Sequence, residues 1–235
     1  MIVEHSKKGS KDVLPLQFSA HATVQELGGG SLAIDFLGDL VFTDDVTGNV
    51  YRLAPSSGDV APLIEAEKGI RYGDFSIHPS KPYLVLAIKE DHRNATPETQ
   101  ATAVINTLVL LDARTNTEST LVQGDDFYSH PRFSPSGSKI SWIQWSHPNM
   151  PWTGTVLHTA DWSTRGIKDV TRIAGESMKE SIAQPSWGVD DTLFFSSDRS
   201  GFWQLFSLRD GSVNPIMLKG LEDSDFATAE WKLGR

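Results

Sequence analysis

Cysteine is absent from the 235-residue sequence, and other absences narrow the possible functions further. Without cysteine there is no disulfide bond and no thiolate chemistry, which fits a reducing compartment such as the cytosol. Basic residues are outnumbered, because 21 Lys and Arg against 30 Asp and Glu give a formal net charge of -9. A surface with this balance does not neutralise phosphates, so we do not expect nucleic acid as a partner.

Long apolar runs and helical patterns are missing as well. No stretch approaches the roughly 20 consecutive apolar residues of a membrane-spanning helix, and the N-terminus lacks the apolar run of a signal peptide. We therefore expect no membrane segment and a cytoplasmic location. The best helical candidate, residues 63–69, is short and has no N-cap. The seven histidines lack the short spacing of a zinc site, and we expect neither a metal nor a cofactor.

The sequence does contain a repeat of short strand pairs. Residues 72–91, 128–147 and 182–201 each read as a strand with an aromatic residue at its end, a polar turn and a second apolar strand. Intervals of roughly 45 to 60 residues between these aromatic anchors suit units of four short strands. The anchors are Phe75, Phe133, Trp187 and Trp231.

Four-stranded units that repeat around an axis make a β-propeller. The predicted fold is all-β, a β-propeller of four-stranded antiparallel blades in a single domain over residues 1–235. Four blades are complete, and the two termini offer the pieces of a partial or composite fifth. Residues 1–7 and 12–18 read as strands, and residues 227–235 read as an innermost strand. Their pairing would close the ring, whereas unpaired termini would leave two open edges for self-association.

Several stretches carry a family resemblance. They include HATVQELGGGSLAI, GDDFYSHPRFSPSGSKISWIQWSHPNMPWTGT, IAGESMKESIAQPSWGVDDTLFFSSDRSGFWQLF and DFATAEWKLG. These stretches resemble the N-terminal propeller of the prolyl oligopeptidase family, in the branch of dipeptidyl aminopeptidases and acylaminoacyl peptidases. The resemblance implies a propeller that filters peptides into a cavity shared with a C-terminal α/β-hydrolase domain, which carries a Ser, Asp and His triad.

The sequence lacks the motif that such a hydrolase domain needs. Its nucleophile sits in Gly-x-Ser-x-Gly, and this pentad does not occur in the chain. Ser136, in the stretch SPSGSK, is better explained as a turn residue. We therefore expect no α/β-hydrolase domain, and the chain is not a serine peptidase on its own.

The stretch SWIQWSHPNMPW, residues 141–152, is dense in aromatic side chains. Strand alternation places Trp142 in the core, whereas the loop after the strand is a candidate surface or pocket. The ligand-binding candidates here are Trp145, His147, Asn149 and Trp152. Packing between blades is the competing explanation, and the two prolines serve mainly to stiffen the loop.

Two further loops follow second strands at equivalent positions, residues 91–100 and 197–203. Each places an Asp beside an Arg, and these pairs are typical of turn stabilisation. If instead Arg93 or Arg199 faces a channel, its planar fork suits a carboxylate ligand. Trp203 closes the second loop and joins the ligand-binding candidates.

Catalytic candidates are few. His130 with Asp126, and His92 with Glu90, offer acid and base pairs because histidine titrates near neutral pH. Glu26, which precedes the triple glycine 28–30, is a candidate for meeting the N-terminus of a peptide. The glycines themselves favour close strand packing over a phosphate loop, because no helix follows them.

Three functions remain open at the level of sequence. The leading hypothesis is a stand-alone propeller that binds a peptide or small molecule in its channel, or docks a separate hydrolase. The first alternative is a recruited biosynthetic enzyme, a cyclase or isomerase, with Trp145 and Trp152 as walls and His130 or Glu26 for proton transfer. The second alternative is a fragment of a full-length serine peptidase.

Overall fold

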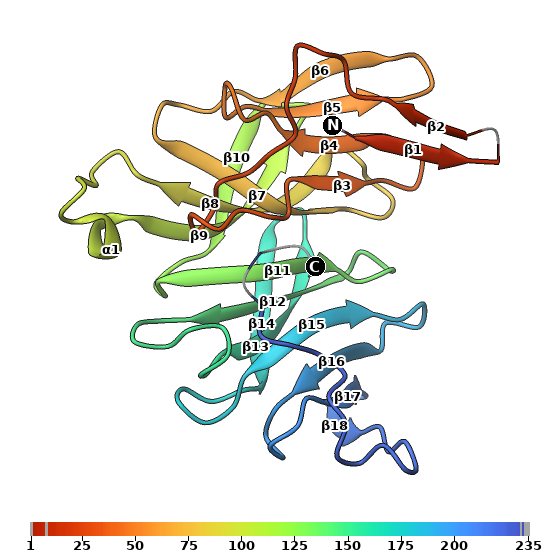
Figure 1. The fold of residues 1–235 in the computed structure, drawn as a ribbon, viewed down its shortest axis with the longest axis vertical. Coiled ribbons are helices and arrows are strands. Elements are labelled where there is room, and N and C mark those ends of the chain that lie inside the picture. Colours follow the sequence, from red (N-terminus) through yellow and green to blue (C-terminus); the bar gives the residue numbers. More distant parts are fainter. Residues whose placement is uncertain (1, 8, 231, 233–235) are drawn as a thin grey trace. The chain divides into compact units, whose positions relative to one another are not determined.

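The computed structural model describes residues 2–7, 9–230 and 232. The described part of the chain forms two compact units, one that runs to Val122 and includes Lys232, and one that begins at Gln123. Nearly all regular structure is β-strand (Figure 1), as the sequence predicts. Short apolar segments between Gly, Pro and Asp turns favour strands, because each segment is too short to repeat apolar residues at helical spacing.

The first unit contains two four-stranded antiparallel sheets and one hairpin. Each four-stranded sheet runs up and down in chain order, as β3-β4-β5-β6 and as β7-β8-β9-β10, and β1 pairs only with β2. The strands are β1 (Val3–Ser6), β2 (Gly9–Asp12), β3 (Leu32–Ile34), β4 (Leu40–Thr43), β5 (Val50–Ala54), β6 (Asp59–Ile64), β7 (Ile70–Ile77), β8 (Leu84–Asp91), β9 (Ile105–Asp112) and β10 (Thr117–Val122).

The second unit contains two more four-stranded antiparallel sheets with the same up-and-down order, β11 to β14 and β15 to β18. Its strands are β11 (Phe127–Phe133), β12 (Lys139–Trp145), β13 (Val156–Ser163), β14 (Gly166–Ala174), β15 (Ile182–Trp187), β16 (Leu193–Ser197), β17 (Gln204–Arg209) and β18 (Ser212–Pro215). With the first unit, this makes four complete propeller blades, which confirms the predicted fold class and the four predicted blades.

The core of each unit lies between the faces of its two sheets. In the first unit, Val41 and Leu63 of one sheet belong to the same buried cluster as Val85 and Val109 of the other. In the second unit, apolar side chains of β12 and β13 pack with those of β15, β16 and β17. Trp142 is 1% exposed, which confirms its predicted place in the core. Within each unit, the two stacked blades therefore bury a shared apolar layer, as the repeat requires.

An irregular residue recurs in the first strand of three blades. Asp74, His130 and Gln184 all have positive φ, between 51° and 53°, and each lies where the register with the second strand shifts. Such a β-bulge inserts an unpaired residue and bends the strand. Ile77, Phe133 and Trp187 each follow the bulge residue of their strand by three positions, so they occupy equivalent places in the three blades. The aromatic anchor predicted at Phe75 is thus two residues too early, because the bulge was not visible in the sequence.

The chain ends differ in part from the prediction. A second strand was expected at residues 12–18, but β2 lies at Gly9–Asp12, and Pro15 cannot donate a ladder hydrogen bond. The expected last strand has no strand assignment over residues 227–230. Trp231 and residues 233–235, on which the fourth anchor and a composite fifth blade depend, lie outside the described residues. A helical turn, α1 (Gln100–Ala103), occupies the loop after β8 rather than residues 63–69.

Candidate functional site

Three loops of the second unit emerge at the same end of its sheets, which we call the loop end. They are residues 146–155 between β12 and β13, residues 175–181 between β14 and β15, and residues 198–203 between β16 and β17. The Thr155 amide donates to the Glu180 carbonyl at 3.1 Å, and the Ser181 amide donates to Asp198 Oδ1 at 2.7 Å. The middle loop therefore joins the outer two.

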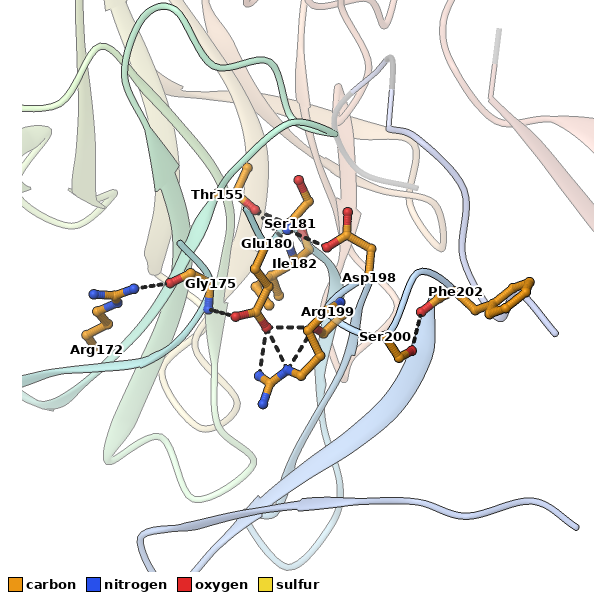
Figure 2. Close-up of polar contacts among 11 residues, drawn as sticks. Thr155, Arg172, Gly175, Glu180, Ser181, Ile182, Asp198, Arg199, Ser200 and Phe202 are labelled. Atoms are coloured by element: carbon orange, nitrogen blue, oxygen red, sulfur yellow. Dashed lines mark hydrogen bonds and ion pairs between the residues drawn. The ribbon is translucent and has the colours of Figure 1, made fainter. Parts of the chain in front are cut away.

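Glu180 organises this end of the unit (Figure 2). Its Oε1 accepts hydrogen bonds from the Ser197 hydroxyl at 2.6 Å and from Arg199 Nε at 2.9 Å. A second guanidinium nitrogen of Arg199 lies 2.7 Å from the same oxygen, and Oε2 accepts the Gly175 amide at 3.2 Å. Because both carboxylate oxygens are occupied and the side chain is largely covered, Glu180 is a structural anchor of the loops.

Asp198 is a partly buried carboxylate of this end with one oxygen beyond the one that holds Ser181. Its Oδ1 holds the Ser181 amide, and Figure 2 shows its side chain beside Ser181 and apart from the Glu180–Arg199 pair. Burial raises the pKa of Asp198, and the nearby negative charge of Glu180 raises it further, while the bond from Ser181 opposes them. A bound cation would offset the repulsion from Glu180 and stabilise the charged form of Asp198. The arrangement is therefore suited to an organic cation.

Gly175 permits the close approach on which these contacts depend. Its φ is +95°, and a Cβ at this position would lie 1.9 Å from the Thr155 carbonyl oxygen. No other residue type fits that space without a backbone shift. The Gly175 amide is then free to donate to Glu180, which fixes the entry to β15.

Two side chains from the aromatic stretch are placed differently. Trp145 was expected at a surface or pocket, but it is 6% exposed, belongs to the core cluster and stacks on Phe127 at 5.4 Å. It follows Ile143 by two positions and so shares that residue's core-facing side of β12. His147 is exposed, packs edge-on against Phe127 at 5.0 Å, and its amide donates to Asp126.

The remaining loop candidates lie at the loop end. Asn149 is buried, and its amide group bonds Ser177 Oγ at 2.9 Å and the Met178 amide at 2.9 Å, so its polar atoms hold the neighbouring loop. Trp152 and Trp203 are half-buried. The Trp203 amide donates to Asp225 at 2.8 Å, which ties the C-terminal segment to the loop before β17.

The two arginine candidates both have carboxylate partners within their own unit. Arg93 forms a two-pronged contact with Asp91 and reaches Glu67 at 2.6 Å, at the edge of a cavity of about 240 Å³ in the first unit. Arg199 is held by Glu180 and lies over the Phe206 ring at 4.4 Å. The predicted turn-stabilising role therefore describes both contacts, and neither guanidinium is an open carboxylate receptor.

His130 lies at the bulge of β11, and the structure brings Glu230 to it. The two side chains approach to 3.5 Å between Nε2 and Oε1, and His130 is 2% exposed. The sequence had suggested Asp126 as its partner, whereas the Asp126 carboxylate accepts the amide of His147. This buried pair has the residue types for proton transfer.

The first unit places the other acid and base candidates together. Glu26 contacts Arg71 at 2.6 Å, and Glu90 contacts His92 at 3.0 Å. Glu90 also accepts the Gln25 amide at 2.8 Å, and burial raises the pKa of Glu90 against the effect of these hydrogen bonds. The predicted Glu90–His92 pair is thus present as a contact, and it fastens the turn that carries Glu26.

The sequence did not single out Glu180. Its four side-chain contacts come from Gly175, at the start of its own loop, and from Ser197 and Arg199, which approach it only in the folded chain, so no local pattern marks it. Asp198 had been seen only as the neighbour of an arginine. Over residues 2–7, 9–230 and 232, the structure contains no group of three His, Asp or Glu side chains able to hold a metal. No helix among those residues is long and apolar enough to cross a membrane.

Solved structures of known proteins resemble this chain, whereas no protein-family model and no curated protein matches it. A puromycin-hydrolyzing peptidase of Mycobacterium tuberculosis is 26% identical, with a TM-score of 0.83, over 99% of this chain. A puromycin hydrolase is also 26% identical, with a TM-score of 0.82, over 99% of this chain. This chain spans 37% of the length of each.

A more distant match extends the likeness in fold. A putative TolB from Agrobacterium tumefaciens is 16% identical, with a TM-score of 0.59, over 90% of this chain and 66% of its own length. At that identity the match speaks for the fold alone. The puromycin-hydrolyzing peptidase and the puromycin hydrolase confirm the resemblance that the sequence predicted.

Proposed function

We propose that this chain, which resembles the propeller of prolyl oligopeptidase-family peptidases, binds a peptide or peptide-like amine and does not cleave it by itself. The observation that carries the proposal is the 26% identity to two puromycin-hydrolysing enzymes over 99% of the chain. Those enzymes are named for puromycin, an aminoacyl nucleoside with a protonated amino group. The chain has no Gly-x-Ser-x-Gly motif, so the proposal gives it binding and positioning rather than bond cleavage.

The loop end of the second unit supports this proposal with a suitable charge. Asp198 is partly buried, lies near a second carboxylate and has one oxygen beyond the one that holds Ser181. An ammonium group near Asp198 gains a charge-assisted hydrogen bond and offsets the repulsion from Glu180. The net charge of -9 adds a longer-range attraction for cations.

Aromatic side chains of the same loop end provide the apolar contact that we propose for such a ligand. Phe202 and Trp203 follow Asp198 in the same loop, and both are half-buried. Trp152 belongs to a neighbouring loop of the same end. Partly covered aromatic rings provide apolar contact area at low entropic cost, which is typical of sites for small amines and peptides.

Calorimetric titration with puromycin tests the proposal, and N-acetylpuromycin is the matched ligand without the positive charge. We expect puromycin to bind and Asp198→Asn to weaken it about 5-fold to 10-fold, the scale of a partly exposed ion pair. Asn keeps an Oδ1 that accepts the Ser181 amide, so the loop should stay folded. Asp223→Asn, an exposed carboxylate of the same unit, is the control. Equal binding of both ligands, or an unchanged affinity in Asp198→Asn, contradicts the proposal.

A second function, the docking of a separate α/β-hydrolase, is favoured by an exposed apolar turn. Ile34, Phe36 and Leu37, at the turn from β3 to β4, are 65%, 62% and 65% exposed. Neighbouring apolar side chains with this exposure are typical of a protein interaction surface. Phe36→Ser with Leu37→Ser should abolish sedimentation with a separately produced hydrolase domain of the similar peptidase. Val189→Ser, at a residue 98% exposed, is the control. Without co-sedimentation of the unmodified chain, this function is wrong.

A further inference from the structure

A groove of about 600 Å³ lies between the two sheets of the second unit, away from the loop end. The turns 188–192 and 210–211, which join β15 to β16 and β17 to β18, stand at its rim. The loop 198–203 joins β16 to β17 and so leaves the opposite ends of the same strands. The groove is therefore separate from the Asp198 region, and its volume is that of a small-ligand pocket.

One wall of the groove is apolar and held in place. Trp187 of β15 pairs with Leu193 of β16, which pairs with Leu208 of β17, so these side chains form one row across the sheet. Trp187 and Leu208 line the groove, whereas Leu193 is fully buried beneath them. The Trp187 Nε1 donates to Ser141 Oγ at 3.0 Å, which fixes the plane of the indole. A fixed aromatic surface is suited to an apolar or cationic group.

The opposite wall carries two hydroxyl groups. Thr159 of β13 and Thr171 of β14 are paired residues, and Thr159 also pairs with Ser141 of β12. The two threonines line the groove, and Ile173 extends this wall along β14. A ligand between the walls would meet hydrogen-bonding groups on one side and an indole on the other.

The rim carries more negative than positive charge. Both of its cations are already paired, because Lys139 contacts Asp161 at 2.7 Å and Arg209 contacts Asp190. The other two rim carboxylates, Asp191 and Asp210, have no ion-pair partner among the residues that the structure describes. Asp191 uses one oxygen to accept the Ser136 amide at 3.1 Å. Two uncompensated carboxylates therefore face an aromatic groove.

We infer that this groove binds an organic cation, a protonated amine on an apolar or aromatic stem, with the stem against Trp187 and Leu208 and the ammonium at Asp191 and Asp210. The hydroxyl wall supplies acceptors for the remaining ammonium hydrogens. An anion is disfavoured there because both rim cations are neutralised and two carboxylates are not.

The test is a titration followed by the NMR signal of the Trp187 indole N–H, assigned by its loss in Trp187→Phe. The probe is 2-phenylethylamine, which is protonated at pH 7, and the matched neutral compound is 2-phenylethanol. We expect the amine to shift the signal saturably, and the alcohol to bind at least 5-fold more weakly. Added salt should weaken the amine, because the rim is open to solvent.

Variants locate the effect. Asp191→Asn with Asp210→Asn should weaken the amine about 5-fold to 10-fold, as expected for two exposed ion pairs. Both residues have positive φ, 58° and 50°, which asparagine tolerates, and the Oδ1 retained in Asp191→Asn can still accept the Ser136 amide. Asp223→Asn and Asp198→Asn should leave the titration unchanged, so failure here is distinguishable from failure of the puromycin site. Absence of a shift, equal shifts with both compounds, or insensitivity to the double variant overturns the inference.

Discussion

Replacement of Glu180 by glutamine should destabilise the second unit by about 2 kcal/mol, the range expected when a charged hydrogen-bonding group is removed. One carboxylate oxygen accepts Ser197 and Arg199, and the other accepts the Gly175 amide. Glutamine has a single acceptor oxygen, so in either orientation its NH2 group faces a donor. At least one donor therefore loses its partner, and Arg199 loses its counter-charge.

Denaturation by urea, followed by tryptophan fluorescence, measures the difference. A loss of about 2 kcal/mol corresponds to a fall in Tm of about 4 to 8 °C for a chain of this size. Glu176→Gln is the matched control, because Glu176 lies four residues earlier in the same loop and pairs with Lys179 at the surface. Because both side chains of that pair are exposed to solvent, Glu176→Gln should lower the free energy of unfolding much less than Glu180→Gln. Equal losses in Glu180→Gln and Glu176→Gln would refute the reasoning.

Three further predictions concern stability. Gly175→Ala should lower the stability of the chain by more than Gly201→Ala does, as measured by calorimetry. Gly201 has a similar φ of +91°, but a Cβ added there meets open space. The left-handed strain of about 1–2 kcal/mol is therefore common to both variants, and the difference between them reports the clash with Thr155. Burial raises the pKa of Asp198, so the folded state loses stability as the pH rises and this carboxyl group must ionise. The free energy of unfolding of Asp198→Asn, measured in urea titrations, should therefore increase relative to that of the unmodified chain between pH 4 and pH 7. A difference in free energy that does not change with pH would contradict this prediction. Burial and a hydrogen bond to Glu118 raise the pKa of Tyr72 far above 10.0. The stability of the unmodified chain should therefore fall above pH 10, and the stability of Tyr72→Phe should fall less over the same range, as measured by circular dichroism.

The repeat of strand pairs predicted most of the fold, because the alternation of apolar residues and the turn residues between them act locally. The four blades and the core position of Trp142 follow from such signals. The bulge before Ile77 does not, since its position depends on pairing with β8, and this displaced the anchor assigned to Phe75.

The site was less accessible to sequence reasoning. Trp142 and Trp145 were both predicted in one strand and point to opposite faces of it, yet both are buried, because β12 packs on both of its faces. The Glu180 contacts join segments 17 to 25 positions apart or meet across a tight turn, and only the folded chain brings them together. Asp198 was visible as half of an Asp-Arg pair, but Arg199 turns to Glu180 instead.

The left-handed residue at the bulge in the first strand of three blades suggests how such a chain can change. Aspartate, histidine and glutamine occupy the same backbone conformation in three blades, and the blades remain four-stranded in each case. A carboxylate, an imidazole and a neutral amide can thus occupy this position while the four-stranded blade stays the same. New chemistry could be introduced there one blade at a time, while the apolar layer that stabilises the fold stays as it is.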